Sequence, residues 1–160
     1  QGTTVCLYLP RCDAAPVAER AVDAARQVVV PAQRTLLVVD DEAPIRHLID
    51  EALVDLGYTV LAVADAAAAL QVLRAGTRVD MLITDMRLRG GMNGKQLADE
   101  ARLARSDLPV LFITGFTEAS PLSQENLHPG TQLLTKPFTL EALALKVAEI
   151  LGSTDAVPSD

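Results

Sequence analysis

The 160-residue sequence is poor in the side chains that cross-link a chain or bind soft metals: it has two cysteines and two histidines. Cys6 and Cys12 have no companions at the spacing of metal ligands, and we expect both to be free thiols. His47 lies on the polar side of a predicted helix and His128 precedes a Pro-Gly turn, so we expect surface positions for both. These scarcities argue against a thiolate or histidine metal centre and against a phosphodonor histidine.

Long apolar runs and an excess of positive charge are missing as well. No apolar run approaches the roughly 20 residues of a spanning helix, and the first residues lack the basic region of a signal peptide. We therefore expect a cytoplasmic location. The 21 acidic residues outnumber the 14 basic ones, and the net charge of -7 repels phosphate backbones and anionic lipids. Neither nucleic acid nor a membrane is expected as a direct partner.

The first 33 residues differ from the rest in pattern. Apolar side chains alternate over residues 3–9 with the period of a half-buried strand, which Pro10 ends. Residues 11–33 are rich in Ala, Glu, Arg and Asp and contain two prolines, which predicts a linker with a possible helix. Because the chain begins with Gln and opens on a strand-like segment, we expect it to be a piece of a longer protein.

From residue 34 onward, short apolar runs alternate with amphipathic stretches. This pattern predicts the α/β class, with five β-α units and a parallel sheet covered by helices on both faces. The predicted strands are residues 36–39, 60–63, 81–84, 110–113 and 133–135. All are short and aliphatic, as strands buried on both faces should be.

Local signals locate the helices between these strands. The first covers residues 45–56, with Pro44 near its first turn and Gly57 past its end. Others are predicted between Asp65 and Gly76, over residues 94–105, and from about residue 139 onward. A fourth, over residues 117–127, contains a proline and should be short or irregular. The domain is thus expected to span residues 34–152, followed by a polar tail at residues 153–160.

Polar residues directly after the apolar strands carry the functional prediction. In an open α/β sheet the ligand site lies beyond the carboxyl ends of the strands. At these positions the sequence has Asp40, Asp41 and Glu42 after the first strand, Asp85 after the third, Thr114 after the fourth and Lys136 after the fifth. We expect these carboxylates, the hydroxyl and the ammonium group to converge at one edge of the sheet.

A cluster of carboxylates needs a cation. Two carboxylates about 4 Å apart repel by roughly 4 kcal/mol at an effective dielectric constant near 20. Oxygen ligands with room for water and phosphate favour Mg²⁺. A carboxylate can attack phosphorus, and the charge that develops needs a metal, a lysine and a hydroxyl donor. Asp85 is therefore the predicted phosphoacceptor, with Mg²⁺, Lys136 and Thr114 in the assisting roles.

Taken one at a time, these residues have ordinary explanations. An Asp-Asp pair after a strand is often a turn or a helix cap, a lone threonine there is usually a cap, and a lysine before a proline is often a solvated charge. Their joint position at the ends of separate strands favours a function. The glycines Gly90, Gly91 and Gly94 lack a following Gly-Lys-Ser/Thr segment, so they are expected to shape a turn and not to hold phosphate.

These same segments resemble a known family. LLVVDDE, LITDMRL, VLFITGF and LLTKPF occur in the order and spacing of the response-regulator receiver domain, from about residue 35 to residue 151. The resemblance implies a flavodoxin-like fold with strand order 2-1-3-4-5. It also implies that Asp85 is phosphorylated from a phosphohistidine, that Asp41 binds Mg²⁺ directly, and that Asp40 acts largely through water. The main-chain oxygen of Arg87 would complete the metal's protein ligands.

The resemblance assigns further roles and also has departures. Thr114 matches the hydroxyl that moves toward the phosphoryl group, Lys136 matches the lysine that pairs with it, and the Lys136-Pro137 bond is cis in the family. The position three residues before the lysine is usually aromatic, whereas here it is Leu133, so aromatic switching is in doubt. The turn after Asp85 is also one residue longer than the commonest form, with Arg89 where proline is frequent.

Residues 1–10 resemble the last strand of a histidine-kinase ATP-binding domain. That resemblance implies a parent hybrid histidine kinase with this receiver at its carboxyl end, in a two-component phosphorelay. The piece alone would lack the nucleotide pocket and the phosphorylated histidine, and it would not be a kinase by itself. The expected partners are a histidine-kinase dimerisation domain or a histidine phosphotransfer protein, with a weak homodimer as a further option.

Three alternatives stay open. A haloacid-dehalogenase-type Mg²⁺ phosphatase also uses an aspartate nucleophile, but it needs a second aspartate two residues later. This chain has Arg87 two residues after Asp85 and Glu42 two residues after Asp40. A flavodoxin would need a hydroxyl-rich loop after the first strand. A degenerate receiver that binds partners without being phosphorylated is the third alternative, and Leu133 motivates it.

Overall fold

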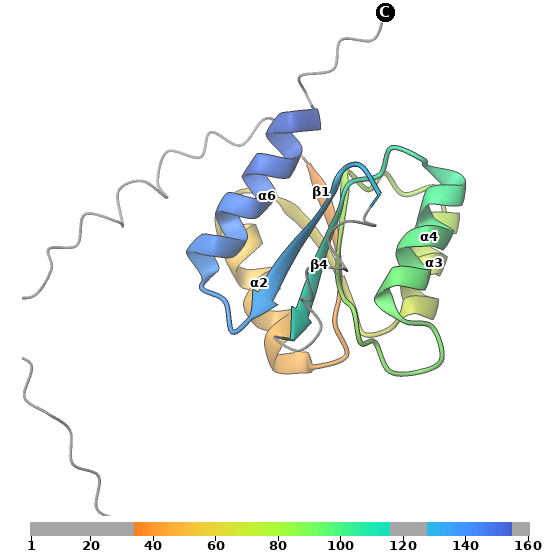
Figure 1. The fold of residues 1–160 in the computed structure, drawn as a ribbon, viewed down its shortest axis with the longest axis horizontal. Coiled ribbons are helices and arrows are strands. Elements are labelled where there is room, and N and C mark those ends of the chain that lie inside the picture. The colour runs from red at the N-terminus through yellow and green to blue at the C-terminus, as the bar shows by residue number, and fades with distance from the viewer. Residues whose placement is uncertain (1–33, 116–127, 155–160) are drawn as a thin grey trace, which may run out of the picture.

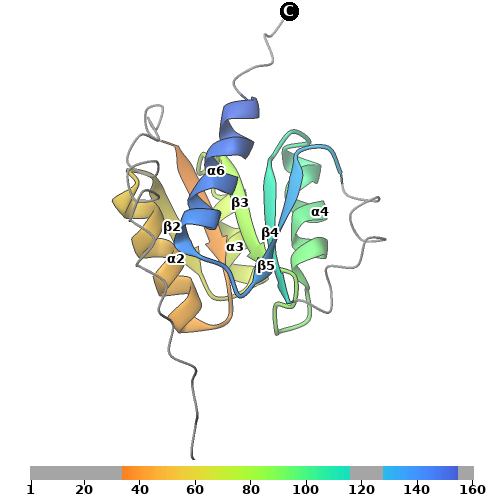
Figure 2. The ribbon, with the colours of Figure 1, turned by 60° about the vertical axis from the view of Figure 1, so that its left-hand side comes forward.

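The structure is a computed structural model that describes residues 34–115 and 128–154. Five parallel strands form one sheet in the order β2-β1-β3-β4-β5 (Figures 1 and 2). They are β1 (Thr35–Val39), β2 (Thr59–Val63), β3 (Met81–Asp85), β4 (Val110–Gly115) and β5 (Thr131–Lys136). The predicted fold class and strand order are confirmed, and each predicted strand lies within an observed one.

Four helices occur in the described part of the chain: α2 (Ala43–Asp55), α3 (Ala66–Arg74), α4 (Gly94–Ala104) and α6 (Leu140–Thr154). Pro44 lies in the first turn of α2, and the Asp65 side chain caps α3 by accepting a hydrogen bond from the Ala68 amide at 2.8 Å. Both helix starts agree with the sequence prediction, and α6 continues two residues into the predicted tail. The predicted segments at residues 3–9, 11–33 and 117–127 lie outside the described residues.

The helices cover both faces of the sheet. Helices α2 and α6 pack on one face and α3 and α4 on the other, as Figure 1 shows. Leu36 and Val38 point into the first of these two layers, whereas Leu37 and Val39 point into the second. Because successive side chains of a strand point to opposite faces, a strand covered on both sides is apolar at every position. This explains the unbroken aliphatic run of β1.

Two helix starts differ in a way that bears on the site. Helix α4 begins with a capping box, in which the Asn93 side chain accepts from the Gln96 amide at 2.9 Å and the Gln96 side chain accepts from the Asn93 amide at 3.0 Å. The N-cap residue of α2 is Glu42, whose side chain makes no capping hydrogen bond. The carboxylate of Glu42 is turned toward Lys136 instead, at 3.7 Å.

None of the helices within residues 34–115 and 128–154 combines the length and the apolar character that crossing a bilayer requires.

Candidate functional site

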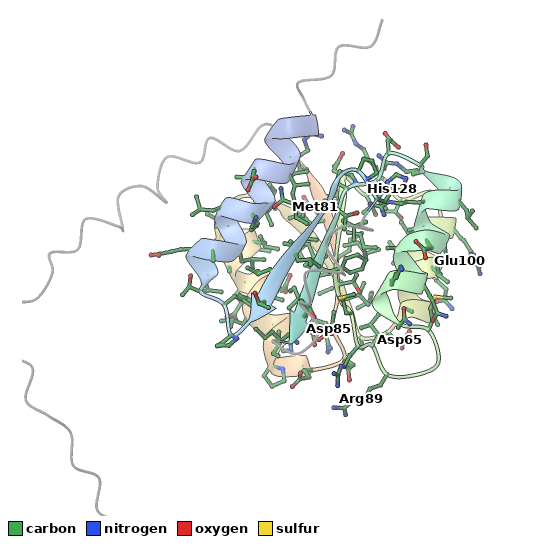
Figure 3. The ribbon with its side chains drawn as sticks, viewed as in Figure 1. Asp65, Met81, Asp85, Arg89, Glu100 and His128 are labelled. Carbon is green, nitrogen blue, oxygen red and sulfur yellow. The ribbon has the colours of Figure 1, made fainter. Side chains whose placement is uncertain are left out.

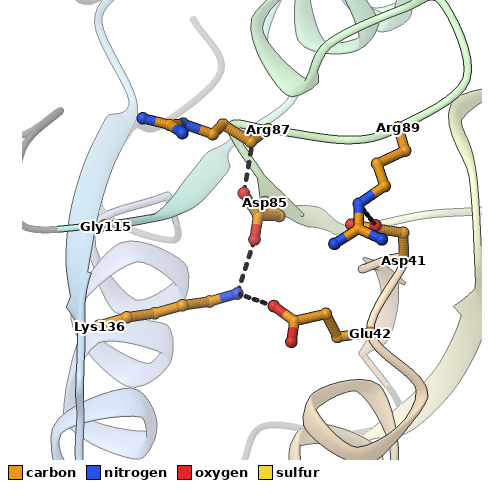
Figure 4. A pocket seen from close by; sticks show the side chains of 7 residues that line it. All are labelled: Asp41, Glu42, Asp85, Arg87, Arg89, Gly115 and Lys136. Carbon is orange, nitrogen blue, oxygen red and sulfur yellow. Dashed lines mark hydrogen bonds and ion pairs between the residues drawn. The ribbon is translucent and has the colours of Figure 1, made fainter.

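A charged pocket lies at the carboxyl end of the sheet (Figure 4). Its walls come from the β1–α2 junction, the loop between β3 and α4, and the ends of β4 and β5. The lining residues are Asp41, Glu42, Asp85, Arg87, Arg89, Gly115 and Lys136. Parallel strands all end at the same edge, so residues almost a hundred positions apart meet here. The structure therefore brings together side chains that the strand-end rule selects from the sequence.

Asp85, the last residue of β3, is held in a fixed orientation inside this pocket. Its Oδ1 accepts a hydrogen bond from the Arg87 amide at 2.7 Å, and its Oδ2 accepts from Lys136 Nζ at 2.6 Å. The buried hydroxyl of Thr84 donates to the main-chain oxygen of Asp85 at 3.1 Å. Figure 3 shows Asp85 and Arg89 at one end of the sheet, and Met81, which starts β3, toward the other. Both carboxylate oxygens of Asp85 are therefore engaged in hydrogen bonds.

Lys136 supplies a positive charge among three carboxylates. Its Nζ lies 2.6 Å from Asp85, 3.3 Å from Asp40 and 3.7 Å from Glu42. Burial alone would lower the pKa of Lys136, but the hydrogen bond to Asp85 and the charges of Asp40 and Asp85 outweigh it, so the pKa is raised. The lysine is therefore a permanent cation at neutral pH.

Asp40 is the most buried of these carboxylates, with 1% of its surface exposed. Its Oδ1 accepts from the Glu42 amide at 2.8 Å, and its main-chain oxygen accepts from Arg46 at 2.6 Å. Burial raises the pKa of Asp40, and the Glu42 amide and Lys136 offset this only in part, while the charge of Asp85 raises the pKa further. Because its environment disfavours the charged form of Asp40, additional positive charge next to this carboxylate would be stabilising.

Three of the acids are arranged as a candidate metal centre. Asp40, Glu42 and Asp85 each offer one carboxylate oxygen, and these oxygens lie within 4.8 Å of one another. Hard oxygen donors of this kind suit Mg²⁺. The donor set therefore fits the expected cofactor.

The predicted ligands do not all occupy this group. Asp40 and Asp85 belong to it, and the Arg87 main chain contacts Asp85 through its amide. Asp41 lines the pocket, but its Oδ2 is 3.0 Å from Arg89 Nε, and among the described residues the close group contains Glu42 in its place. Thus Asp41 as a direct ligand stays a prediction.

Thr114 lies just behind the pocket wall. It is fully buried, and its hydroxyl donates to the main-chain oxygen of Gly115 at 3.3 Å. Gly115, and not Thr114, is the residue of β4 that lines the pocket. A hydroxyl contribution from Thr114 would therefore require a change in its side-chain orientation.

The sequence prediction placed Glu42 at this edge of the sheet but gave it no role, and it did not place Arg89 in the pocket. The sequence did contain a signal for Glu42 as a pocket residue, because Glu42 continues the acidic run after the first strand. Arg89 was noted only because it replaces a frequent proline in a long turn. Its approach to Asp41 depends on the conformation of that turn, which side-chain type alone does not reveal.

Other sequence predictions can be checked in the same region. His47 and His128 are both exposed, as predicted, and Figure 3 shows His128 at the end of the sheet away from Asp85. The Lys136-Pro137 peptide bond is cis. Leu133 packs, partly buried, against the layer formed with α3 and α4.

Comparisons with known proteins agree with this geometry. Residues 36–148 match the family model of the response regulator receiver domain. The chain is 31% identical to the sensor kinase CckA of Brucella abortus (strain 2308), over 97% of this chain and 17% of the kinase. It is 34% identical to the chemotaxis protein CheY of Pseudomonas aeruginosa, over 72% of this chain and 94% of that protein.

A solved structure is similar in fold as well as in sequence. The crystal structure of a response regulator receiver protein from Sinorhizobium medicae WSM419 superposes with a TM-score of 0.69 at 32% identity. The match covers 76% of this chain and 97% of that one. Among the first curated relatives, the chain spans only 17% to 51% of their lengths.

Proposed function

Because this chain belongs to the response regulator receiver domain family, we propose that it accepts a phosphoryl group on Asp85 from a phosphohistidine. The observation that carries the proposal is the pair of contacts at Asp85. Its carboxylate lies in the pocket with one oxygen on Lys136 at 2.6 Å and the other on the Arg87 amide at 2.7 Å. These contacts support Asp85 as the nucleophile and Lys136 as the group that stabilises the developing charge.

The proposed reaction is a direct transfer between two side chains. A carboxylate oxygen of Asp85 attacks phosphorus while the phosphorus–nitrogen bond of the donor breaks. The electron pair stays on the imidazole, which then takes up a proton. Lys136, a cation with a raised pKa, stabilises the negative charge on the phosphoryl oxygens.

Mg²⁺, held by Asp40, Asp41, Asp85 and the main-chain oxygen of Arg87, would neutralise the carboxylates and the transferred group. The acidic residues of the chain themselves support this part of the proposal. Asp40, Glu42 and Asp85 approach within 4.8 Å, and burial raises the pKa of Asp40. One lysine only partly balances so many negative charges.

Output is proposed to run through Thr114 and the surrounding loops. The Thr114 hydroxyl, now on the main-chain oxygen of Gly115, would turn toward the phosphoryl group. Leu133 has no ring that could follow this movement, so a change in the loops or onward phosphotransfer would carry the signal. The partners would be a histidine-kinase dimerisation domain or a histidine phosphotransfer protein in the cytoplasm.

We further propose that the chain is the receiver part of a hybrid histidine kinase. The similarity to the CckA sensor kinase covers 97% of this chain, whereas the receiver family model covers residues 36–148. The kinase similarity therefore extends over residues before the receiver. This supports the resemblance of residues 1–10 to the last strand of a kinase ATP-binding domain.

Acetyl phosphate tests the phosphoacceptor directly. Incubated with it and Mg²⁺, the chain should gain one phosphoryl group by intact-mass spectrometry, and a chelator should prevent the gain. Asp85→Asn should abolish labelling, whereas Asp107→Asn, at an exposed turn before β4, should leave it unchanged. Labelling that persists in Asp85→Asn would overturn the site. Continuous turnover of a generic phosphate ester, without saturation, would favour a phosphatase.

A further inference from the structure

Arg89 is a charged side chain of the pocket that the proposed transfer does not use. It is exposed over 86% of its side chain, yet its Nε lies 3.0 Å from Asp41 Oδ2. Figure 4 shows its guanidinium group next to Asp41, on the side of the pocket away from Lys136. Lys136 and Arg89 thus lie on opposite sides of the carboxylates that line the pocket (Figure 4).

The loop after β3 is shaped so that Arg89 faces the pocket. Leu88, directly before it, is buried in the core layer of α3 and α4. Gly90 and Gly91, directly after it, both have φ of 104°, in a region that side-chain-bearing residues rarely adopt. Arg89 thus lies between a buried residue and two glycines with positive φ, in a loop that lines the pocket.

The Arg89 contact coincides with the position of Asp41 outside the close acidic group. Asp40, Glu42 and Asp85 have oxygens within 4.8 Å of one another, and within the described part of the chain Asp41 is not included. Asp41 Oδ2 is instead the atom that pairs with Arg89. The one carboxylate that has its own arginine is therefore also the one that stands apart.

We propose that Arg89 is a displaceable counter-ion of Asp41, which competes with Mg²⁺ for this carboxylate and sets the Mg²⁺ concentration at which the site loads. The inference rests on the proposed function in that Mg²⁺ is taken as the metal of the site. Arg89, and not Lys136, is the cation that leaves, because Lys136 is only 21% exposed and lies within 4.0 Å of three carboxylates. Within residues 34–115 and 128–154, the ion-pair partner of Arg89 is Asp41 alone, and water can replace that contact at low cost.

The size of the effect follows from the exposure of Arg89, whose side chain is 86% exposed, whereas that of Asp41 is 18% exposed. Exposed ion pairs shift an equilibrium by a factor of only about 1.4 to 5. Removing the guanidinium also removes a like charge from beside the incoming Mg²⁺, which acts in the same direction. We therefore expect Arg89→Gln to tighten Mg²⁺ binding about two- to fivefold.

A Mg²⁺ titration of the ¹⁵N-labelled 160-residue chain, followed by amide NMR shifts, measures this without any phosphotransfer. Arg89→Gln should lower the Mg²⁺ dissociation constant, and Arg89→Lys should lie between it and the wild type. Arg74→Gln removes the same charge from an exposed position at the end of α3, outside the pocket, and should have no effect. Unchanged or weaker binding in Arg89→Gln would overturn the proposal, as would a wild type with no Mg²⁺-dependent shift.

The Asp41→Asn background tests whether Arg89 acts through Asp41. There, Arg89→Gln should no longer tighten Mg²⁺ binding. An undiminished effect would point to the general field of the arginine and would overturn the role of Asp41.

Failure of this inference and failure of the proposed function give different results. If acetyl phosphate labels Asp85 while Arg89→Gln leaves Mg²⁺ binding unchanged, only the counter-ion role is wrong. If Mg²⁺ binding depends on Arg89 and Asp41 while no labelling occurs, the counter-ion role stands and phosphoacceptance is wrong.

Discussion

Gly94, the first residue of α4, packs directly against the strand end that carries Asp85. A Cβ at Gly94 would lie 2.1 Å from the main-chain oxygen of Asp85 and 2.9 Å from its carbonyl carbon. These are backbone atoms of β3, which is paired with a strand on each side, so they cannot move aside as a flexible side chain can. By helix propensity alone, replacing a helical glycine by alanine would raise the free energy of unfolding by at most about 1 kcal/mol. Forcing extra volume into a packed site costs about 1–3 kcal/mol.

We therefore expect Gly94→Ala to lower the free energy of unfolding by about 1–2 kcal/mol. The chain has no tryptophan, so urea unfolding should be followed by far-UV circular dichroism. Labelling of Asp85 by acetyl phosphate should also slow, because the clash falls on the main chain of that residue.

Gly152→Ala is the matched control for this substitution. Gly152 lies in α6, and its Cβ would meet nothing within 4 Å. This variant should be neutral or more stable by up to about 1 kcal/mol. If Gly94→Ala is as stable as the wild type and labels at the same rate, the steric argument is wrong.

Two further predictions concern buried charges. Lys136→Met leaves Asp40 and Asp85 without their shared cation. In a chelator at pH 7, this substitution should lower the free energy of unfolding by about 1–3 kcal/mol. The loss is smaller than for a fully buried ion pair because the lysine is partly exposed. Added Mg²⁺ should restore more stability to this variant than to the wild type, and a variant as stable as the wild type in chelator would contradict the argument. Asp80, at the opposite end of the sheet, has a lowered pKa: burial raises it, but hydrogen bonds from the Thr35 amide at 2.8 Å and from a neighbouring arginine outweigh burial. Because the pKa is lower in the folded chain, the stability it contributes is present above its unfolded pKa of about 3.9 and is lost as the pH falls below that value. Asp80→Asn should therefore cost about 1–3 kcal/mol at pH 7 in urea unfolding, and the difference from the wild type should shrink toward pH 3; a constant difference would refute the linkage.

The strands could be located from the sequence because burial on both faces removes polar residues from them. The run from Leu36 to Val39 is buried at every position, which gives a strong local signal. Strand β5 begins at Thr131, two residues before its predicted start. Thr131 pairs with Val110 of β4, and its strand conformation depends on that neighbour and not on a hydrophobic pattern.

The convergence of charged side chains at one edge of the sheet could be predicted in the same way. Asp40, Asp85 and Lys136 could be predicted to converge because they lie at or directly after the ends of buried strands, and parallel strands end at one edge. Glu42 and Arg89 were not assigned roles. An N-cap residue commonly bonds to its own helix, whereas Glu42 approaches Lys136, and the direction of Arg89 depends on the loop backbone.

By itself, the sequence determined the α/β class, the order of the elements and the gathering of acidic side chains and Lys136 at the carboxyl edge of the sheet. These depend on hydrophobic periodicity and on residue type, which are local properties of the chain. Only the tertiary structure decided which oxygens come within 4.8 Å, that Lys136 serves three carboxylates, and that Asp41 pairs with Arg89. Such distances follow from strand register and loop conformation, because electrostatic energy depends on the separation of charges in space and not on their separation along the chain.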